Sequence, residues 1–135
     1  MAAPTVTYRD LDLTFLPHAT TGDVSQLTDV AAVRRSIKTL IMTPYNTRPF
    51  QPTLGSSVGN LLFELSDTVT ERMLVEEINR TISTFEPRAQ VMEILVSQPD
   101  PLSYTISIVV LVNLDPNPVV ITMNVNPSES LVRIR

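Results

Sequence analysis

Apolar and polar side chains alternate near the beginning of the chain. Across residues 8–16, Leu11, Leu13 and Phe15 fall on one side and polar residues fall on the other. A period of two is typical of a strand with one buried and one solvated face. We therefore predict a half-buried strand here, ended by Pro17, since proline cannot donate a ladder hydrogen bond.

Alternation returns in the last third of the chain. Apolar residues occupy every second position in three stretches, which we place near residues 89–97, 102–114 and 119–126. Turns rich in Pro, Asp and Asn separate these stretches at 99–101 and 115–118. Short turns join antiparallel neighbours, so the pattern predicts a three-stranded antiparallel meander.

Residues 28–42 repeat their apolar side chains every three or four positions, which is the spacing of one face of a helix. Asp23 and Thr28 are both candidate N-caps, and Pro44 ends the pattern. The apolar positions are Val30, Val33, Ile37, Leu40 and Ile41. The basic residues, which we expect on the solvated face, are Arg34, Arg35 and Lys38.

A second helix is predicted over residues 68–86. Thr68 and Glu71 have the spacing of a capping box, in which both side chains bond to the first amide groups of a helix. Pro87 stops the helix, because the residue before proline avoids helical angles. The apolar side chains that define its buried face are Leu74, Ile78, Ile82 and Phe85.

The segment between the helices, residues 45–57, contains two prolines that forbid a regular helix or a central strand. Its apolar side chains, Tyr45, Phe50 and Leu54, predict that it nevertheless packs against the protein. A short turn or helix is expected at 58–65.

Together these elements predict an α+β fold, with an N-terminal strand and two main helices packed on a C-terminal antiparallel β-meander. We expect a single domain over residues 1–135, with residues 1–7 and 127–135 as extended arms. The C-terminal arm ends in apolar and basic residues, which suit an additional strand in its own sheet or in the sheet of a neighbour.

Composition excludes several classes of function. A net charge of −4 gives no bulk attraction to nucleic acid or to an anionic membrane, so neither is expected as a partner. With no Cys and a single His, His18, the chain lacks thiolate and multi-histidine metal sites. Its longest apolar run, residues 108–112, is far shorter than the roughly 20 residues of a membrane-spanning helix. No cofactor or metal is expected.

Candidate catalytic groups are few. His18 lies in a polar loop without a nucleophile motif, so a solvated histidine is its ordinary role. Glu64 follows an apolar triplet and pairs in principle with Asp67, Glu71 or Glu86, as a glycosidase requires two carboxylates. The alternative is that Asp67 and Glu71 stabilise a helix start through its dipole, and that Glu86 pairs with Arg88 or with a partner. A muramidase therefore stays open as a rival function.

Two charged motifs surround prolines, Arg48-Pro49-Phe50 and Glu86-Pro87-Arg88. A planar guanidinium suits paired carboxylates, which makes both arginines candidates for contacts with other proteins. The alternative is an internal salt bridge from Arg48 to Glu64 or Glu86 that holds the loop. We expect Arg88→Ala to weaken docking while melting hardly changes, whereas a loss of about 3 kcal/mol would indicate a buried internal pair.

Four segments in order resemble the baseplate wedge and sheath-initiator family of contractile-tailed phages, a lysozyme-like wedge protein family with relatives in type VI secretion. They are AVRRSIKTLIMT at 32–43, RPFQPTLGS at 48–56, LLFE at 61–64 and EPR at 86–88. The likeness covers about residues 8–125. One departure is Asn46-Thr47, where the family usually has Gly-Glu, although Asn is the next best residue for a left-handed turn.

The resemblance implies a structural component of the virion tail baseplate, assembled in the host cytoplasm and present in six copies. Its partners would be the tail sheath protein and other baseplate wedge proteins, with tail tube or hub proteins as further candidates. Glu86, Pro87 and Arg88 would hold the core bundle of the wedge, with Arg48 and Glu64 as further protein-interaction residues. The strands at 102–114 and 119–126, with the tail, would start sheath polymerisation by strand exchange.

Three rivals remain at this stage. One is the muramidase already described. Another is the equivalent baseplate part of a type VI secretion system or other contractile injection system. The third is a stand-alone ligand-binding α+β domain, which would be a monomer with a closed pocket and no edge-strand pairing.

Overall fold

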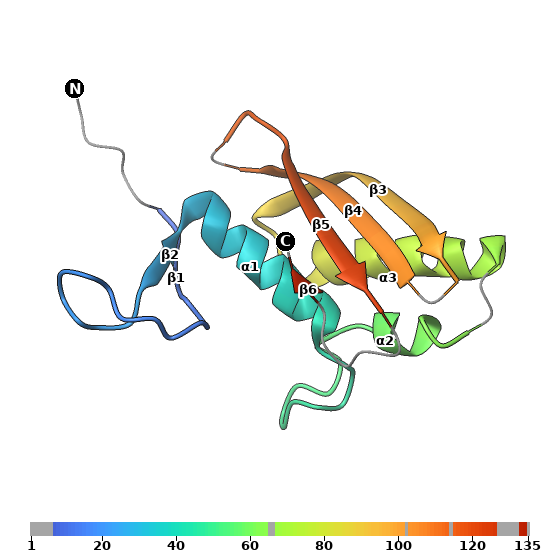
Figure 1. Cartoon of the computed structure of the whole chain (residues 1–135), viewed down its shortest axis with the longest axis horizontal. Coiled ribbons are helices and arrows are strands. Elements are labelled where there is room, and N and C mark those ends of the chain that lie inside the picture. Colours follow the sequence, from blue (N-terminus) through green and yellow to red (C-terminus); the bar gives the residue numbers. More distant parts are fainter. Residues whose placement is uncertain (1–6, 65–66, 102, 114, 127–132, 135) are drawn as a thin grey trace.

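A computed structural model describes residues 7–64, 67–101, 103–113, 115–126 and, for the backbone, 133–134. Two helices lie against one face of a twisted sheet, and a small two-stranded ribbon extends from the N-terminal end of the first helix (Figure 1). This confirms the predicted α+β fold. In order along the chain, the elements are β1 (Arg9–Leu11), β2 (Gln26–Thr28), α1 (Asp29–Met42), α2 (Val58–Leu61), α3 (Thr68–Phe85), β3 (Ala89–Asp100), β4 (Ser103–Val112), β5 (Val119–Val125) and β6 (Arg133–Ile134).

The main sheet has the order β3-β4-β5-β6, with every neighbouring pair antiparallel. The first three strands are the predicted meander. The pairing of β3 with β4 is irregular between Ser97 and Asp100, and β3 then continues to Asp100, into the predicted turn. The connection between the two strands is therefore shorter than expected. The C-terminal strand β6 adds to the chain's own sheet, pairing Ile134 with Met123 and Arg133 with Asn124 of β5.

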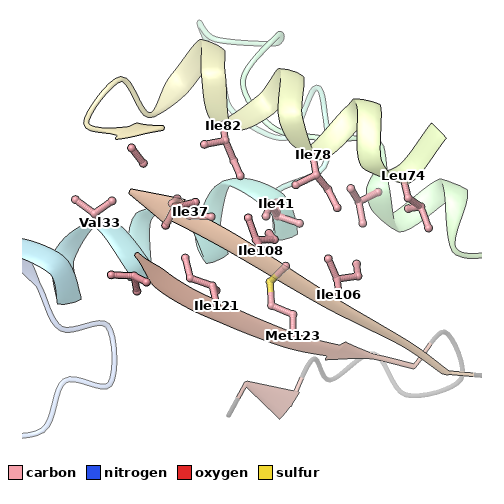
Figure 2. Close-up of a cluster of buried hydrophobic side chains, with 14 of the residues drawn as sticks. Val33, Ile37, Ile41, Leu74, Ile78, Ile82, Ile106, Ile108, Ile121 and Met123 are labelled. Carbon is pink, nitrogen blue, oxygen red and sulfur yellow. The ribbon is translucent and has the colours of Figure 1, made fainter. Parts of the chain in front are cut away.

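The core lies between the sheet and the two long helices. Along β4 buried and half-buried residues alternate, and the buried set faces α1 and α3. Figure 2 shows this layer, in which side chains from both helices point at side chains of β4 and β5. The labelled residues are Val33, Ile37 and Ile41 of α1, Leu74, Ile78 and Ile82 of α3, Ile106 and Ile108 of β4, and Ile121 and Met123 of β5. Burial of such branched aliphatic side chains is the main stabilising contribution to the fold.

The helix starts differ from the prediction. At α3 the cap is Asp67, whose Oδ1 accepts a hydrogen bond from the Thr70 amide at 2.7 Å, so the predicted Thr68 capping box is wrong. A carboxylate at this position also interacts favourably with the helix dipole. At α1 the N-cap position is Thr28, but its side chain makes no capping bond. The described helices contain no segment long and apolar enough to cross a bilayer.

The N-terminal strand is shorter and more exposed than predicted. β1 ends at Leu11 because the next residues form a turn, with the Asp12 carboxylate accepting from the Thr14 amide and its carbonyl from the Phe15 amide. β1 pairs only with β2, outside the main sheet, and the predicted buried side is about half exposed or more. No second layer formed by the described residues covers this ribbon, so its period-two pattern does not indicate burial.

Lys38 is also placed differently from the prediction. It was expected on the solvated face with Arg34 and Arg35, but its residue is only 8% exposed. It directly follows Ile37, at the flank of the apolar stripe of α1. Burial and the nearby charges of Arg34 and Arg35 lower its pKa.

Candidate protein-interaction surface

The Glu86-Pro87-Arg88 motif forms an internal ion pair. The guanidinium of Arg88 donates from Nε to Oε1 of Glu86 at 2.5 Å and from Nη2 to Oε2 at 2.6 Å. The Glu86 side chain is 2% exposed and that of Arg88 is 28% exposed. Pro87 lies between them on the surface. This geometry favours the alternative of a buried internal pair, in which removal of Arg88 leaves a buried carboxylate unpaired and lowers stability.

This ion pair joins segments that are distant in the sequence. Ser36 on α1 lies close enough to the Glu86 carboxylate to help lower its pKa. The guanidinium of Arg88 lies over the ring of Tyr8, 5.1 Å from the ring centroid. The backbone carbonyl of Arg88 accepts a hydrogen bond from the Asn113 amide at 3.1 Å. The motif thus fixes α1, the end of α3 and the N-terminal segment relative to one another.

Electrostatics favour the charged form of both partners. Burial alone raises the pKa of Glu86, but the interactions with Arg88 and Ser36 outweigh it, so the net pKa lies below the ordinary value. Hydrogen bonding to Glu86 raises the pKa of Arg88 against the opposing effect of its burial. The pair therefore remains ionised at neutral pH.

The loop between α1 and α2 is held by Glu77 of α3. Oε1 of Glu77 accepts from the Tyr45 hydroxyl at 2.5 Å and from the Ser57 amide at 2.8 Å, near both ends of the loop. Arg80 donates to both oxygens of Glu77 and stacks over the Tyr45 ring. The alternative considered for Arg48, a salt bridge to Glu64 or Glu86, is absent among the described residues. A network centred on Glu77, which sequence reasoning missed, restrains the loop instead.

The base of the same loop requires glycine at Gly55. Its φ is +126°, and an added Cβ would lie 2.4 Å from the Thr43 carbonyl oxygen. That carbonyl accepts the Ser56 amide at 2.8 Å, and the Ser56 hydroxyl donates to Ile41. The chain therefore returns to the C-terminal end of α1 in close contact, and Tyr45 and Leu54 are half-buried as predicted. Phe50, which was also expected to pack against the protein, is instead fully exposed at the tip of the loop.

Beside the ion pair the surface forms a hollow of about 370 Å³. The N-terminal ribbon contributes Leu11 and Leu13, α1 contributes Ser36, and the loop contributes Arg48 and Leu54. Arg48 is exposed and makes no ion pair within the described part of the chain. Asp10 and Arg35 also line the hollow. It therefore combines apolar side chains with charged groups, among which Arg48 is the cation that we expect to meet a carboxylate of a partner.

The candidate acid Glu64 does not lie in an apolar environment. It is exposed just after α2, and the nearby Asp67 carboxylate is occupied as the cap of α3. The backbone hydrogen bond from Thr70 lowers the pKa of Asp67, which opposes a role as proton donor. His18 lies in an exposed loop, and no group of three or more metal-ligating side chains occurs among the described residues.

The two edges of the main sheet differ in how they are protected. β3 contains a bulge between Val91 and Glu93, a charged Glu93 and Pro99, which are features that discourage strand addition. β5 has no charged residue or proline, and β6 covers it only at Met123 and Asn124. The outer edge of residues 119–122 therefore has no strand partner within the described chain. β4 is paired on both sides and offers no edge.

Solved structures with the same fold include components of two baseplates and one further protein. The chain matches a component of the anti-feeding prophage baseplate at 21% identity and a TM-score of 0.70, covering 78% of this chain and 86% of that one. A component of the postcontracted pyocin R2 baseplate matches at 16% identity and a TM-score of 0.56, covering 88% and 98%. A Geobacter sulfurreducens protein, described provisionally as a tail lysozyme, matches at 19% identity and a TM-score of 0.65, covering 73% and 91%.

Sequence comparison gives the family directly. No significant match is found among curated protein sequences. The family model described as baseplate wedge protein gp25 matches residues 28–117, about two thirds of the chain. The match runs from the start of α1 to the turn before β5 and includes both charged motifs, which confirms the resemblance read from the sequence. The chain belongs to the baseplate wedge protein gp25 family and is a structural component of a contractile-tail baseplate.

Proposed function

We propose that this baseplate protein docks on neighbouring wedge proteins and starts polymerisation of the tail sheath by β-strand exchange. The observation that carries the sheath role is the uncharged outer edge of β5, which β6 covers only at two residues. Unpaired backbone groups on such an edge are a template for a strand from another chain. The exchange site is narrower than the sequence predicted, because β4 is internal.

In this account β6 is the strand that is exchanged. An incoming sheath strand pairs along β5, and the C-terminal tail leaves β5 to pair with the sheath subunit. Each chain then exchanges one antiparallel pairing for another, so little backbone hydrogen bonding is lost during assembly.

Docking on the wedge uses the hollow beside the Glu86-Pro87-Arg88 motif. Glu86 is buried and does not contact a partner directly, so the ion pair positions the walls of the hollow. Arg48 supplies the free charge, and Pro87 and the exposed part of Arg88 extend the surface. Glu64, exposed just after α2, contributes a carboxylate. The partners are the sheath protein and other wedge proteins, with tube or hub proteins as further candidates. Six copies of this protein are present in each baseplate, which is assembled in the host cytoplasm.

The same features argue against catalysis, and we take the protein to be non-enzymatic. Glu64 is exposed, and Asp67 is held in its charged form as a helix cap. A muramidase acid needs the opposite setting, a carboxyl kept protonated by apolar surroundings. If the protein cleaved peptidoglycan and Glu64→Gln abolished the cleavage, the structural proposal would need replacing.

Docking is tested with a pair of charge reversals. Arg48→Glu should weaken binding to purified cognate wedge proteins by about tenfold or more, because it places a carboxylate against a carboxylate. Arg34→Glu is the matched control, since Arg34 is exposed on α1 and does not line the hollow. Equal binding by both variants, measured by calorimetry, would contradict the docking surface.

Strand exchange is tested at the two sheet edges. Val120→Lys adds a charge beside the open edge of β5, and Gln90→Lys adds the same charge on β3. We expect Val120→Lys and deletion of residues 127–135 to leave folded proteins that no longer nucleate sheath in electron micrographs, while Gln90→Lys nucleates normally. Normal nucleation by the truncated protein would show that the tail has no such role.

A further inference from the structure

The tip of the loop between α1 and α2 is a tight turn with an unusual residue. The Gln51 amide donates to the Arg48 carbonyl at 3.3 Å, which closes the turn. Pro49 occupies its second position and Phe50, with φ of +69°, its third. Proline followed by a positive φ is the pattern of a type II turn, whose third position strongly prefers glycine. Phenylalanine is strained there, because its Cβ crowds the backbone.

The strain brings no compensating contact with the part of the chain that the structure describes. Phe50 is 103% exposed, so its ring is fully in water. Gly would remove the backbone strain at this position, and a polar side chain would suit its exposure to water. Either replacement would favour the folded state more than Phe does. A single exposed apolar residue on unstrained backbone is common and needs no explanation. An exposed aromatic residue on strained backbone is different, because the fold gains nothing from it.

The loop nevertheless holds Phe50 in one place. The Asn46 amide donates to the Pro52 carbonyl at 3.0 Å across the loop, and the Thr47 hydroxyl donates to the Pro44 carbonyl at 2.7 Å. Below this, Glu77 fixes both loop ends, as described above. In Figure 1 the loop projects from the C-terminal end of α1, away from the sheet. A restrained aromatic group loses little conformational entropy on binding.

The charge beside Phe50 indicates what it meets. Arg48 lies two residues earlier in the same turn, is exposed, and has no ion pair in the described structure. A complementary surface has an apolar pocket for the ring and a carboxylate at the rim for the guanidinium. Aromatic residues, Phe among them, and Arg are enriched at protein interfaces, and Arg is one of the residues that most often dominate the binding energy.

We infer that Phe50 is the anchor of the wedge interface, inserting into an apolar pocket of a neighbouring wedge protein that presents a carboxylate to Arg48. The inference rests on the proposed docking function and names the chemistry of its partner. Arg48 lines the docking hollow, so the anchor is continuous with that surface and engages the same protein. The backbone strain is retained because the exposed ring is needed at that position.

Two substitutions separate an anchor from a structural residue. Phe50→Ala removes the ring and keeps a side chain at positive φ, whereas Phe50→Gly removes both the ring and the strain. We expect each to weaken binding to purified cognate wedge protein by about tenfold or more. The melting temperature should stay unchanged in Phe50→Ala and stay equal or rise in Phe50→Gly. Phe63→Ala is the control, because Phe63 is 74% exposed without a positive φ.

The outcomes are distinct. Weaker binding by both Phe50 variants with undiminished melting temperatures supports the anchor. If wild-type protein binds and both Phe50 variants bind equally well, the anchor is overturned while the docking function stands. If wild-type protein does not bind the wedge protein at all, the docking function itself is contradicted. A fall in melting temperature in both variants would show that the ring stabilises the fold. Loss of self-association, measured by light scattering, would show that the ring contacts a second copy of this chain. Either result overturns the inference.

Discussion

The hydroxyl of Tyr45 donates a hydrogen bond to Oε1 of Glu77, 32 positions further along the chain, at 2.5 Å. The same oxygen accepts the Ser57 amide, so one carboxylate on α3 holds both ends of the loop that presents Arg48 and Phe50. The position of this loop therefore depends on α3 as much as on the loop's own sequence.

Removal of that carboxylate should loosen the loop. Glu77→Ala leaves the Ser57 amide and the Tyr45 hydroxyl without their acceptor, at a cost of about 1–3 kcal/mol in unfolding free energy. Hydrogen exchange of residues 45–57 should accelerate while exchange in β4 is retained. Glu76→Ala, at an exposed neighbouring position on the same helix, should change urea unfolding by less than about 0.5 kcal/mol. Equal effects of the two variants would contradict the role of Glu77.

The internal ion pair predicts a large effect of a single truncation. Arg88→Ala should lower the unfolding free energy by about 3–5 kcal/mol, because Glu86 stays buried without its partner. Combined replacement of Glu86 and Arg88 by Met should recover much of that loss, since no charge is then left buried. A double variant as unstable as Arg88→Ala would show that desolvation of Glu86 is not the cause.

Glu86 also predicts the acid response. Its folded pKa is below the ordinary value of 4.5, so the unfolded chain binds more protons as the pH falls. The stabilisation is complete above that ordinary value and is lost as pH decreases through the lower folded pKa. In urea titrations at several pH values, wild-type unfolding free energy should fall below about pH 4.5. The curve for Glu86→Gln should be flatter, with the remaining slope due to Asp12, Asp29 and Asp67, whose pKa values are also lowered.

At Gly55, substitution should be poorly tolerated. Gly55→Ala places a methyl group against the Thr43 carbonyl and forces a side chain onto a φ of +126°. We expect a loss of about 2 kcal/mol or more in thermal or urea unfolding. Gly59→Ala is the control, because an added Cβ there meets nothing within 4 Å. Similar losses for both would argue against the close approach of loop and helix.

Tyr104 carries a buried hydroxyl with no hydrogen-bond partner in the described structure. Tyr104→Phe removes the uncompensated polar atom and keeps the packed ring. We expect unfolding free energy to be unchanged or to rise by up to about 1 kcal/mol. A clear loss of stability would show that the hydroxyl has a partner when the chain is in solution.

The sequence predicted the elements that depend on local periodicity. Both long helices and the meander follow from spacing and proline positions, and their bounds differ from the structure by only a few residues. The N-terminal ribbon was overestimated, because alternation at Leu11 and Leu13 reports a strand but not whether another layer covers it. The Asp67 cap was missed because Thr68 offered an equally good local motif.

The interaction surface was only partly accessible to the same reasoning. The charged residues beside prolines identified Arg48, Glu86 and Arg88 as candidates. Whether Glu86 and Arg88 pair with each other or face a partner depends on how deeply the folded protein buries them, which the sequence does not reveal. Glu77 was not identified, because Tyr45 and Ser57 approach it only after α3 packs beside the loop. The strain at Phe50 likewise depends on a turn closed by backbone bonds.

Co-assembly of this protein with its cognate sheath and neighbouring wedge proteins, imaged by electron microscopy, separates a sheath initiator from a passive part of the baseplate. Sheath rings or tubes should start on wedge complexes only when the protein is present, and should not start when it carries Val120→Lys. Sheath assembly at the same rate without the protein, or no association of the protein with either partner, would show that it is not an initiator.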